Sequence, residues 1–246
     1  MFNKILIILL LLASHKLKDA EVTNHWIIWN VGQGQWITHV TTEACLHFDV
    51  GGEIGTFSRI RKSLVKNCAR KRNHILLSHW DLDHFIHVPH VRKTLPQLCW
   101  QSRPALPLKR KISAERIAAL PIFYCTEQAL TIQHWVPQSG KSANDFSIVH
   151  YQDGFLLPGD STIAAEKKWS EELPSIKNTK VLIAGHHGSR TSTSSLLLSK
   201  LPNLQMTIVS ARKARYGHPH KKVLTRLRNK KTPVLTTEDW GSIWIL

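Results

Sequence analysis

The sequence predicts an α/β fold in which two β-sheets pack face to face and helices cover their outer sides. The short β-rich runs fall into two blocks, and each block ends in strand–loop–helix units, which is typical of that layered arrangement. The early runs alternate between apolar and polar residues and are joined by tight turns, which disfavours a doubly wound parallel sheet. A chain of 246 residues suffices for one substantial domain, or at most two small ones.

The first block is rich in β-branched and aromatic residues. Gly32-Gln33-Gly34 predicts a hairpin turn between its first two strands, and the apolar run His74–Ser78 predicts a buried strand. We expect strands at 26–31, 36–40, 45–50 and 74–78, and a basic helix at 57–71.

The middle of the chain is less regular, and the second block follows it. Pro96, Pro104, Pro107 and the cluster Lys109-Arg110-Lys111 predict a proline-broken basic loop. Further strands are expected at 122–125, 130–136, 146–151, 155–157, 181–184 and 206–210. Helices are expected at 161–173, with Ser161 or Thr162 as the cap, at 194–201 and at 219–228. The runs 233–237 and 242–246 are expected to close the chain as a pair of strands.

The N-terminus predicts export. Lys4 precedes an apolar run at 5–13, which is shorter than the ~20 residues that span a bilayer but fits the core of a signal peptide. No clean small-x-small cleavage triplet follows, so an uncleaved anchor or a buried first strand is the alternative. We therefore divide the chain into a signal peptide or N-terminal membrane leader, 1–20, and one domain, 21–246. The expected location is periplasmic or secreted, or tethered to the membrane by the leader.

The charge balance predicts a polyanionic partner. Lys and Arg number 33 against 17 Asp and Glu, a net charge of +16 that exceeds what solubility requires. Nucleic acid is the leading candidate, and anionic membranes or polysaccharides are the alternatives. With 42% hydrophobic and 20% charged residues, the chain is neither disordered nor collagenous nor a polytopic membrane protein.

The four cysteines are scattered without any C-x-x-C spacing, which argues against a zinc ribbon or a thioredoxin-type redox site. In an exported protein they would form one or two disulfides, with three pairings open if all are bonded. Buried free thiols are the alternative.

The segment Ser78–His84 is the most specific chemical signal. Four potential metal ligands, His79, Asp81, Asp83 and His84, follow a buried strand, and burying so much charge without a cation would be costly. Imidazole and carboxylate ligands suit zinc, manganese or iron. In extended chain His79, Asp81 and Asp83 would face one side, while the loop turns His84 toward a second ion. A solvated acidic turn is the alternative.

Two further strand-end loops carry potential ligands. Asp160 follows the apolar run 155–157, although a capping or turn aspartate would look the same. His186 and His187 follow the run 181–184, and adjacent histidines point different ways, so one can ligate while the other orients substrate. Together the three loops predict a two-metal site.

With these motifs the sequence strongly resembles the metallo-β-lactamase superfamily, and in particular the ComEC-type hydrolase domain of the DNA-uptake channel of natural competence. The resemblance covers essentially all of the chain after the leader and implies a four-layer αββα sandwich of two mixed β-sheets flanked by helices. The segments that carry it are Asn30–Gly34, Asp49–Gly52, His79–His84, Asn144–Ser147, Gly159-Asp160, His186–Ser189 and Arg215–Pro219.

The resemblance implies two divalent ions, Zn or Mn, and no organic cofactor. By resemblance, the metal ligands are His79 and Asp81 for one ion, Asp83, His84 and His186 for the other, and Asp160 as a bridge between them. Asp49 would orient the motif loop, and Asp145 would support the site beside Asn144. The superfamily's separate histidine between these motifs has no clear counterpart, so the first ion would keep more water.

Some positions depart from the family pattern. Asp81 replaces the second histidine of the superfamily motif, as in the ComEC-like branch, whereas Asn30 and Gln35 replace the usual acids of the opening motif. Phe85-Ile86-His87 replaces a glycine-containing continuation. No implied ligand is lost, so activity is expected.

In the implied mechanism the two ions activate water for attack on phosphorus, and no protein nucleophile is required. The expected catalytic residues are Asp83 and Asp160, which hold the ions, and His218, which protonates the leaving oxygen. The residues expected to bind substrate and stabilise its charge are Asn144, His187, Ser189, Arg190, Thr191, Arg215 and Tyr216. Solvated surface positions are the alternative for the two arginines, and a turn before a helix for Tyr216 and His218.

The sequence therefore predicts a metal-dependent nuclease or phosphodiesterase acting on DNA, beside or independently of a membrane DNA-uptake channel. The alternatives are a small-molecule hydrolase of the same fold, such as a phosphorylcholine-type esterase or a lactonase, and a non-catalytic nucleic-acid-binding protein. The net charge favours DNA, and Asp81 disfavours a β-lactamase. Nine tryptophans offer stacking surfaces for single-stranded bases, although most are expected in the core. Five basic clusters could track a phosphate backbone: Arg59–Lys62, Lys66–Arg72, Lys109–Lys111, Arg212–Arg215 and Lys221-Lys222.

Overall fold

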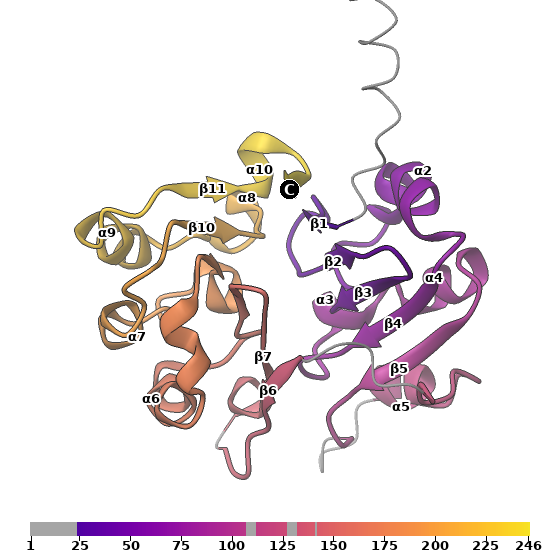
Figure 1. The fold of residues 1–246 in the computed structure, drawn as a ribbon, viewed down its shortest axis with the longest axis horizontal. Coiled ribbons are helices and arrows are strands. Elements are labelled where there is room, and N and C mark those ends of the chain that lie inside the picture. Colours follow the sequence, from indigo (N-terminus) through magenta and orange to yellow (C-terminus); the bar gives the residue numbers. More distant parts are fainter. Residues whose placement is uncertain (1–23, 107–111, 127–131, 141) are drawn as a thin grey trace, which may run out of the picture.

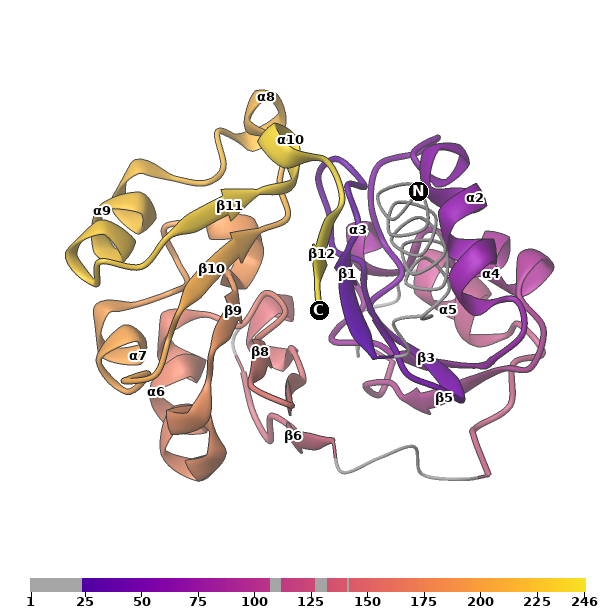
Figure 2. The ribbon, with the colours of Figure 1, turned by 45° about the horizontal axis from the view of Figure 1, so that its top comes forward.

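The predicted four-layer αββα fold is confirmed. The computed structural model describes residues 24–106, 112–126, 132–140 and 142–246, which form two mixed sheets of six strands each with helices on their outer sides (Figures 1 and 2). The predicted leader, 1–20, and the cluster Lys109–Lys111 lie outside the described residues. Within the described part of the chain, none of the helices has the length and apolarity to cross a bilayer.

The first sheet has the strand order β12-β1-β2-β3-β4-β5. Strands β1 (His25–Ile28), β2 (Ile37–Val40) and β3 (Ala44–Phe48) are antiparallel, whereas β4 (Arg72–Leu76) and β5 (Leu98–Ser102) run parallel to β3. Its outer face is covered by α2 (Phe57–Cys68), α4 (Val88–Thr94) and α5 (Ile112–Ala118). Helix α2 buries Phe57, Ile60 and Leu64 at helical spacing against this sheet.

The second sheet has the order β11-β10-β9-β8-β7-β6. Strands β6 (Gln133–Trp135), β7 (Val149–Gln152) and β8 (Phe155–Leu157) are antiparallel, and β9 (Val181–Ile183), β10 (Met206–Val209) and β11 (Val234–Thr236) continue parallel to β8. Its outer face packs against α6 (Ile163–Glu172), α7 (Ser195–Ser199) and α9 (Lys221–Asn229). Of the two caps considered for α6, Thr162 is the one used, since its hydroxyl accepts from the Ala165 amide.

The apolar core has three principal layers. One cluster lies between the first sheet and its helices, a second between the second sheet and its helices, and a third between the two sheets. In β1, Trp26 and Ile28 belong to the inter-sheet layer and Ile27 to the helix side, so both faces of the strand are buried.

The predicted pairing of the two C-terminal strands is wrong. Strand β11 pairs with β10 in the second sheet, whereas β12 (Ile243–Ile245) pairs antiparallel with β1 in the first. The short helix α10 (Thr237–Trp240) and Gly241, which has a φ of 74°, turn the chain from one sheet to the other. Local sequence cannot reveal this crossing, because each strand pairs with a segment that it does not neighbour in the chain.

The described residues in the middle of the chain form more helix and strand than expected. Pro96 and Pro104 lie outside the ends of β5 and leave its five residues free to pair with β4. The two prolines therefore flank a strand and do not interrupt one. The run expected at 122–125 makes only one bridge, between Tyr124 and Trp100. Helices α3 (Leu82–Phe85), α4 and α5 were not expected, because they are short and carry little periodic signal.

Two disulfides cross-link the first half of the molecule, one of the alternatives left open by the sequence. Cys45 on β3 is bonded to Cys68 at the end of α2, and Cys99 on β5 to Cys125. The first fastens a helix to the sheet beneath it, and the second fastens the segment around Cys125 to an edge strand.

His47 on β3 is fully buried and uncharged. Its Nδ1 lies 3.0 Å from Thr38 Oγ1 and 3.4 Å from Trp36 Nε1, and its Nε2 lies 3.2 Å from Asn73 Oδ1. Because the indole nitrogen can only donate, Nδ1 is the acceptor and Nε2 carries the proton. Burial, opposed in part by the hydrogen bond to Asn73, lowers the pKa of His47 to about 4.

Replacing His47 with glutamine is expected to make the free energy of unfolding less dependent on pH below pH 7. The pKa of His47 is about 4 in the folded state and near 6.5 when unfolded, so the unfolded chain binds more protons between those values. The free energy of unfolding therefore falls as the pH drops from 6.5 toward 4, and His47 accounts for about 2 kcal/mol of the loss between about pH 7 and pH 4.5. Urea unfolding of both proteins at these two pH values measures the difference. Equal losses in wild type and H47Q would contradict it.

Candidate metal centre

The predicted ligands come together at one edge of the two sheets. The motif loop 78–84 follows β4, and Asp49 follows its parallel neighbour β3. In the second sheet Asp160 follows β8 and the two histidines follow its parallel neighbour β9. Parallel strands end at the same edge of a sheet, which brings these side chains together although the chain separates them by more than a hundred residues.

Asp49 holds the motif loop in place. The carboxylate is 1% exposed and accepts hydrogen bonds from the amide of Ser78 (2.7 Å), the hydroxyl of Ser78 (2.8 Å), Gln35 Nε2 (2.8 Å) and His84 Nδ1 (2.7 Å). The bond to Nδ1 orients the His84 ring so that Nε2 points into the centre. Gln35, which departs from the family pattern, here donates to the buried carboxylate.

Asp160 lies at the middle of the centre with two imidazoles on each side. Its Oδ1 is 3.1 Å from His84 Nε2 and 3.6 Å from His187 Nε2. Its Oδ2 is 3.5 Å from His186 Nε2 and 3.8 Å from His79 Nε2. An aspartate between two sets of imidazoles has the position expected of a bridging ligand.

Two further carboxylates complete the two sets. Asp81 Oδ2 lies 3.5 Å from His79 Nε2, and Asp83 Oδ2 lies 3.3 Å from His187 Nε2. By these distances His79, Asp81 and His186 lie on the side of Asp160 Oδ2, and Asp83, His84 and His187 on the side of Oδ1. The donor atoms of Asp83, His84 and His187 lie within 4.8 Å of one another, which suits a shared ion. Those of His79, His84 and Asp160 are equally close, so His84 lies within reach of both sides.

These residues fit bound divalent cations. His79 Nε2 is buried and makes no hydrogen bond among the described residues, and Asp160 Oδ1 is buried with His84 Nε2, 3.1 Å away, as its nearest described imidazole nitrogen. His84 Nε2 lies only 3.2 Å from His187 Nε2, while the Nδ1 atoms of both rings point outward, toward Asp49 and the Ser210 carbonyl. Buried orphaned atoms and facing ring nitrogens are costly, and a cation between them would satisfy both.

The electrostatics of the centre also favour a cation. Burial alone would raise the pKa of Asp160, but His84 and His187 hold it well below its ordinary value. Burial would likewise lower the pKa of His84, but Asp160 and Asp49 hold it well above the ordinary value. Burial also opposes ionisation of Asp83, yet its contact with His187 lowers its pKa to about 2. The carboxylates are therefore ionised at neutral pH and attract positive charge.

The structure arranges the two adjacent histidines differently from the expectation. His187 lies with Asp83 and His84, where His186 was expected, and His186 lies on the side of His79. Both residues have left-handed backbone, with φ of 50° and 54°, so their rings both turn inward, whereas in an extended chain they would point opposite ways. His186 thus lies on the side of His79, where the sequence offered no second histidine. His187, which was expected to contact substrate, lies where a metal ligand would lie.

The two residues of the Asn-Asp pair have different contacts, because Asn144 touches a candidate ligand and Asp145 supports the surrounding loop. Asn144 Nδ2 is 3.3 Å from His186 Nδ1, which places it against a candidate ligand. Asp145 accepts from the Ser142 amide in a capping box and from the Thr162 hydroxyl, so it supports the loop that carries Asn144.

The loop after the histidines brings two predicted phosphate contacts near the centre. Thr191 Oγ1 is 3.3 Å from His186 Nδ1 and 3.0 Å from Ser189 Oγ. Arg190 between them is exposed, as expected of a solvated position. Glu166, whose role the sequence did not suggest, holds this loop from below by accepting from the amides of Thr193 and Ser194.

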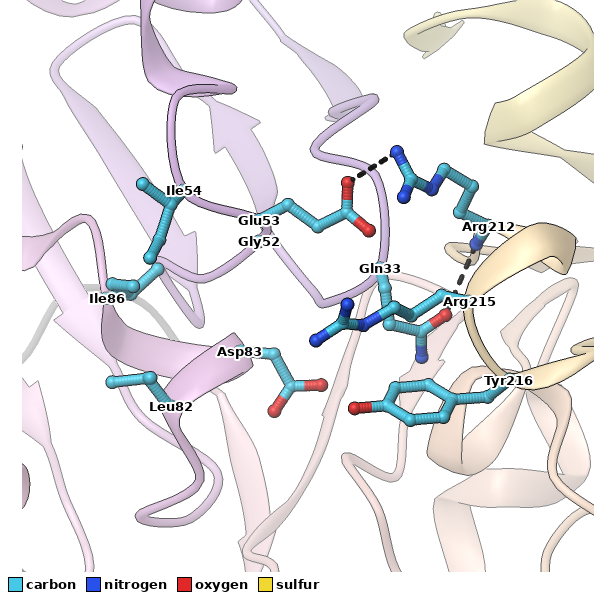
Figure 3. Close-up of a pocket in the computed structure, with 10 residues that line it drawn as sticks. All are labelled: Gln33, Gly52, Glu53, Ile54, Leu82, Asp83, Ile86, Arg212, Arg215 and Tyr216. Atoms are coloured by element: carbon cyan, nitrogen blue, oxygen red, sulfur yellow. Dashed lines mark hydrogen bonds and ion pairs between the residues drawn. The ribbon is translucent and has the colours of Figure 1, made fainter.

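The segment 212–218 forms the opposite wall. The His218 ring centroid is 6.0 Å from that of His186, and burial together with the nearby His187 and His186 lowers the pKa of His218 to about 4. An imidazole with that pKa is uncharged at neutral pH, which favours hydrogen bonding to a phosphate oxygen over proton donation. Arg215 and Tyr216 lie on α8 (Lys213–Tyr216) and face Asp83 across a cleft (Figure 3).

Sequence reasoning missed three contacts that support the centre. Ser78 binds Asp49 twice, Ser210 accepts from His187 through its backbone carbonyl, and Gln35 binds Asp49. Ser78 could have been found because it begins the motif. The carbonyl of Ser210 could not, because every residue carries one.

Comparison with known proteins agrees with the fold and with the resemblance. No protein-family model matches the sequence. The chain is 34% identical over 106 residues to ComE operon protein 3 of Bacillus subtilis (strain 168), covering 42% of this chain and 14% of that protein. It is 25% identical over 241 residues to competence protein ComA of Neisseria gonorrhoeae, covering 92% of this chain and 32% of that protein. It is 30% identical over 181 residues to recombination protein 2 of Haemophilus influenzae, covering 69% of this chain and 21% of that protein. The matches thus span about a third or less of each relative.

Solved structures share the architecture at low sequence identity. The metallo-β-lactamase fold protein YhfI from Bacillus subtilis superposes with a TM-score of 0.54 at 12% identity, covering 90% of this chain and 99% of that one. A diphosphatase of the PhnP family gives a TM-score of 0.51 at 10% identity, covering 90% and 97%. The chain therefore has the metallo-β-lactamase fold, and its similarity to ComE operon protein 3, competence protein ComA and recombination protein 2 agrees with the ComEC-type resemblance.

Proposed function

We propose that this protein is a two-metal phosphodiesterase that hydrolyses DNA. The observation that carries the proposal is the position of Asp160, whose two carboxylate oxygens each face two imidazoles, with Asp81 and Asp83 at the outer edges. The net charge of +16 and the similarity to a competence protein and a recombination protein support DNA as the substrate.

The residues of the centre would bind the ions and hold them in place. When bound, two divalent ions supply Lewis acidity to a phosphate and bring the pKa of water close to neutrality. Asp160 would hold the ions together with His79 and His186 on one side and His84 and His187 on the other. Asp49 keeps the His84 ring oriented through its hydrogen bond to Nδ1. The chain then needs no nucleophile of its own.

The walls of the centre would position the phosphate. Ser189 and Thr191 offer hydroxyls beside His186, and His218 offers an uncharged imidazole on the other side of that ring. Arg215 brings a permanent positive charge to the cleft beside Asp83. These donors would stabilise the negative charge that develops on the phosphate oxygens.

We place the activity outside the cytoplasm, beside a membrane DNA-uptake channel. The apolar run at 5–13, the two disulfides and the similarity to a competence protein support this location. Detection of the protein in a periplasmic or culture fraction of its own cells would test it, and retention in the cytosol would contradict it.

The test of the function is hydrolysis of DNA by purified protein residues 21–246. Linear and single-stranded DNA are incubated with Mn²⁺ or Zn²⁺, and cleavage is expected only with metal and only with intact Asp83. Cleavage that D83A leaves unchanged would refute the metal assignment. DNA binding without cleavage would favour a non-catalytic binding protein, and turnover confined to small phosphodiesters or lactones would favour a small-molecule hydrolase.

A further inference from the structure

A cleft of about 420 Å³ opens beside Asp83 (Figure 3). It lies between the loop that precedes α2 and helix α3 on one side and helix α8 on the other, so each half of the molecule supplies one wall. Asp83 is among its lining residues, so the cleft adjoins the candidate metal centre. The volume is within the range of small-ligand sites.

One wall of the cleft is apolar although it faces solvent. Ile54 is 85% exposed and Leu82 is 48% exposed, and Ile86 lies beside them. Single exposed apolar residues are ordinary, but three that line the same cleft form a surface on which a flat apolar ligand can pack. Figure 3 shows these three side chains together on the side of the cleft opposite α8.

The other wall is aromatic and cationic. Tyr216 is 62% exposed, and the guanidinium carbon of Arg215 lies 5.5 Å from the centre of its ring. Arg212, the other arginine of the cleft, is paired with Glu53 at 3.0 Å, and this ion pair spans the two walls. Among the described residues Arg215 has no carboxylate partner, so its charge is available to a ligand.

We infer that this cleft binds one unpaired nucleotide next to the scissile phosphate, with Tyr216 as the residue that recognises the base. The base would lie between the Tyr216 ring and the wall of Ile54 and Leu82, and Arg215 would bind a phosphate oxygen. A base within a duplex has both faces covered by its neighbours, so only a terminal, extruded or single-stranded base can enter. The inference rests on the proposed function, because it assumes that the scissile phosphate lies at the metal centre.

The test compares two small probes that differ only in the base. Calorimetry measures the binding of thymidine 5′-monophosphate and of deoxyribose 5-phosphate to the protein in the presence of Mn²⁺. The nucleotide is expected to bind between about 5-fold and 150-fold more tightly, which is the effect of stacking one base on an aromatic side chain. In Y216A the two probes are expected to bind with equal affinity. In R215Q both affinities are expected to fall by the same factor, so that their ratio stays as in the wild type. F123A, which removes an aromatic side chain that is 82% exposed and does not line the cleft, is expected to change neither.

The outcomes separate this inference from the proposed function. A ratio near one in the wild type, or a ratio that Y216A leaves unchanged, would overturn the inference even if the protein cleaves DNA. A large ratio that depends on Tyr216, in a protein that cleaves no DNA, would keep the nucleotide site and refute the nuclease. Circular dichroism of each variant checks that it is folded. Cleavage of a relaxed, covalently closed circular duplex, which has no terminal base, as rapidly as a single strand would also contradict the inference.

Discussion

Asp160→Asn is expected to lower metal-dependent hydrolysis by about 1000-fold or more. Asp160 is 3% exposed and its carboxylate lies beside imidazoles on both sides, so one substitution removes a negative charge that both candidate ions would share. Loss of the Lewis acidity that two ions supply costs several kcal/mol of transition-state stabilisation, and each 1.4 kcal/mol is about tenfold in rate. The measurements are the rate of DNA hydrolysis and the number of Mn²⁺ ions retained after gel filtration.

Two substitutions of the same kind serve as controls for this prediction. Asp153 is exposed in the turn between β7 and β8, and D153N is expected to change neither rate nor metal content. Asp49 supports His84 without facing the ions, and D49N is expected to weaken metal binding by about 10-fold to 100-fold, the usual effect of losing such a partner. A D160N protein that retains two ions and full activity would exclude Asp160 as the bridge.

Gly51→Ala is expected to destabilise the fold by about 3 kcal/mol or more, the upper end of the cost of overpacking a rigid interior. A Cβ atom at this position would lie 1.7 Å from the Asp83 carbonyl oxygen and 2.5 Å from His84 Cα. These are backbone atoms and cannot rotate away. The same carbonyl accepts from the amides of Gln35 (3.0 Å) and Gly52 (2.9 Å), so the motif loop would have to move away from the turn that holds it. Urea unfolding of the metal-free protein measures the loss.

Gly55→Ala is the matched control. A Cβ there would meet nothing within 4 Å, and the only cost is that of a side chain at a φ of 86°, about 1 kcal/mol. If G51A were no less stable than G55A, close packing of the glycine turn against the motif loop could not be what fixes Asp83. If G51A folds, its affinity for Mn²⁺ should also fall, since Asp83 and His84 would be displaced.

Much of the fold could be predicted because its strands are local patterns. The run 155–157 forms β8 with the expected bounds, and 181–184 and 206–210 form β9 and β10 nearly as expected. The errors arose where pairing is non-local. Strand β12 joins β1 across the whole length of the chain, and β5 lies between two prolines that suggested a loop.

The candidate site was predicted as a set of residues, and the arrangement of that set was not. His79, Asp83, His84 and Asp160 lie together as expected, because each follows a strand whose end points to the same edge. The exchange of His186 and His187 depends on two consecutive left-handed residues, a backbone conformation that non-glycine residues seldom adopt and that the sequence did not predict.

The sequence by itself determined which chemical groups are available to the candidate site of this protein. It determined the imidazoles, the carboxylates, the excess of positive charge and the strands that carry them, since these depend on residue type and on short-range periodicity. Only the tertiary structure decided which histidine faces which side of Asp160, that Gln35 and Ser78 hold Asp49, and that Tyr216 and Ile54 line the same cleft. The reason is physical: such contacts join distant segments, and their geometry is fixed by sheet packing and loop dihedral angles that no single segment specifies.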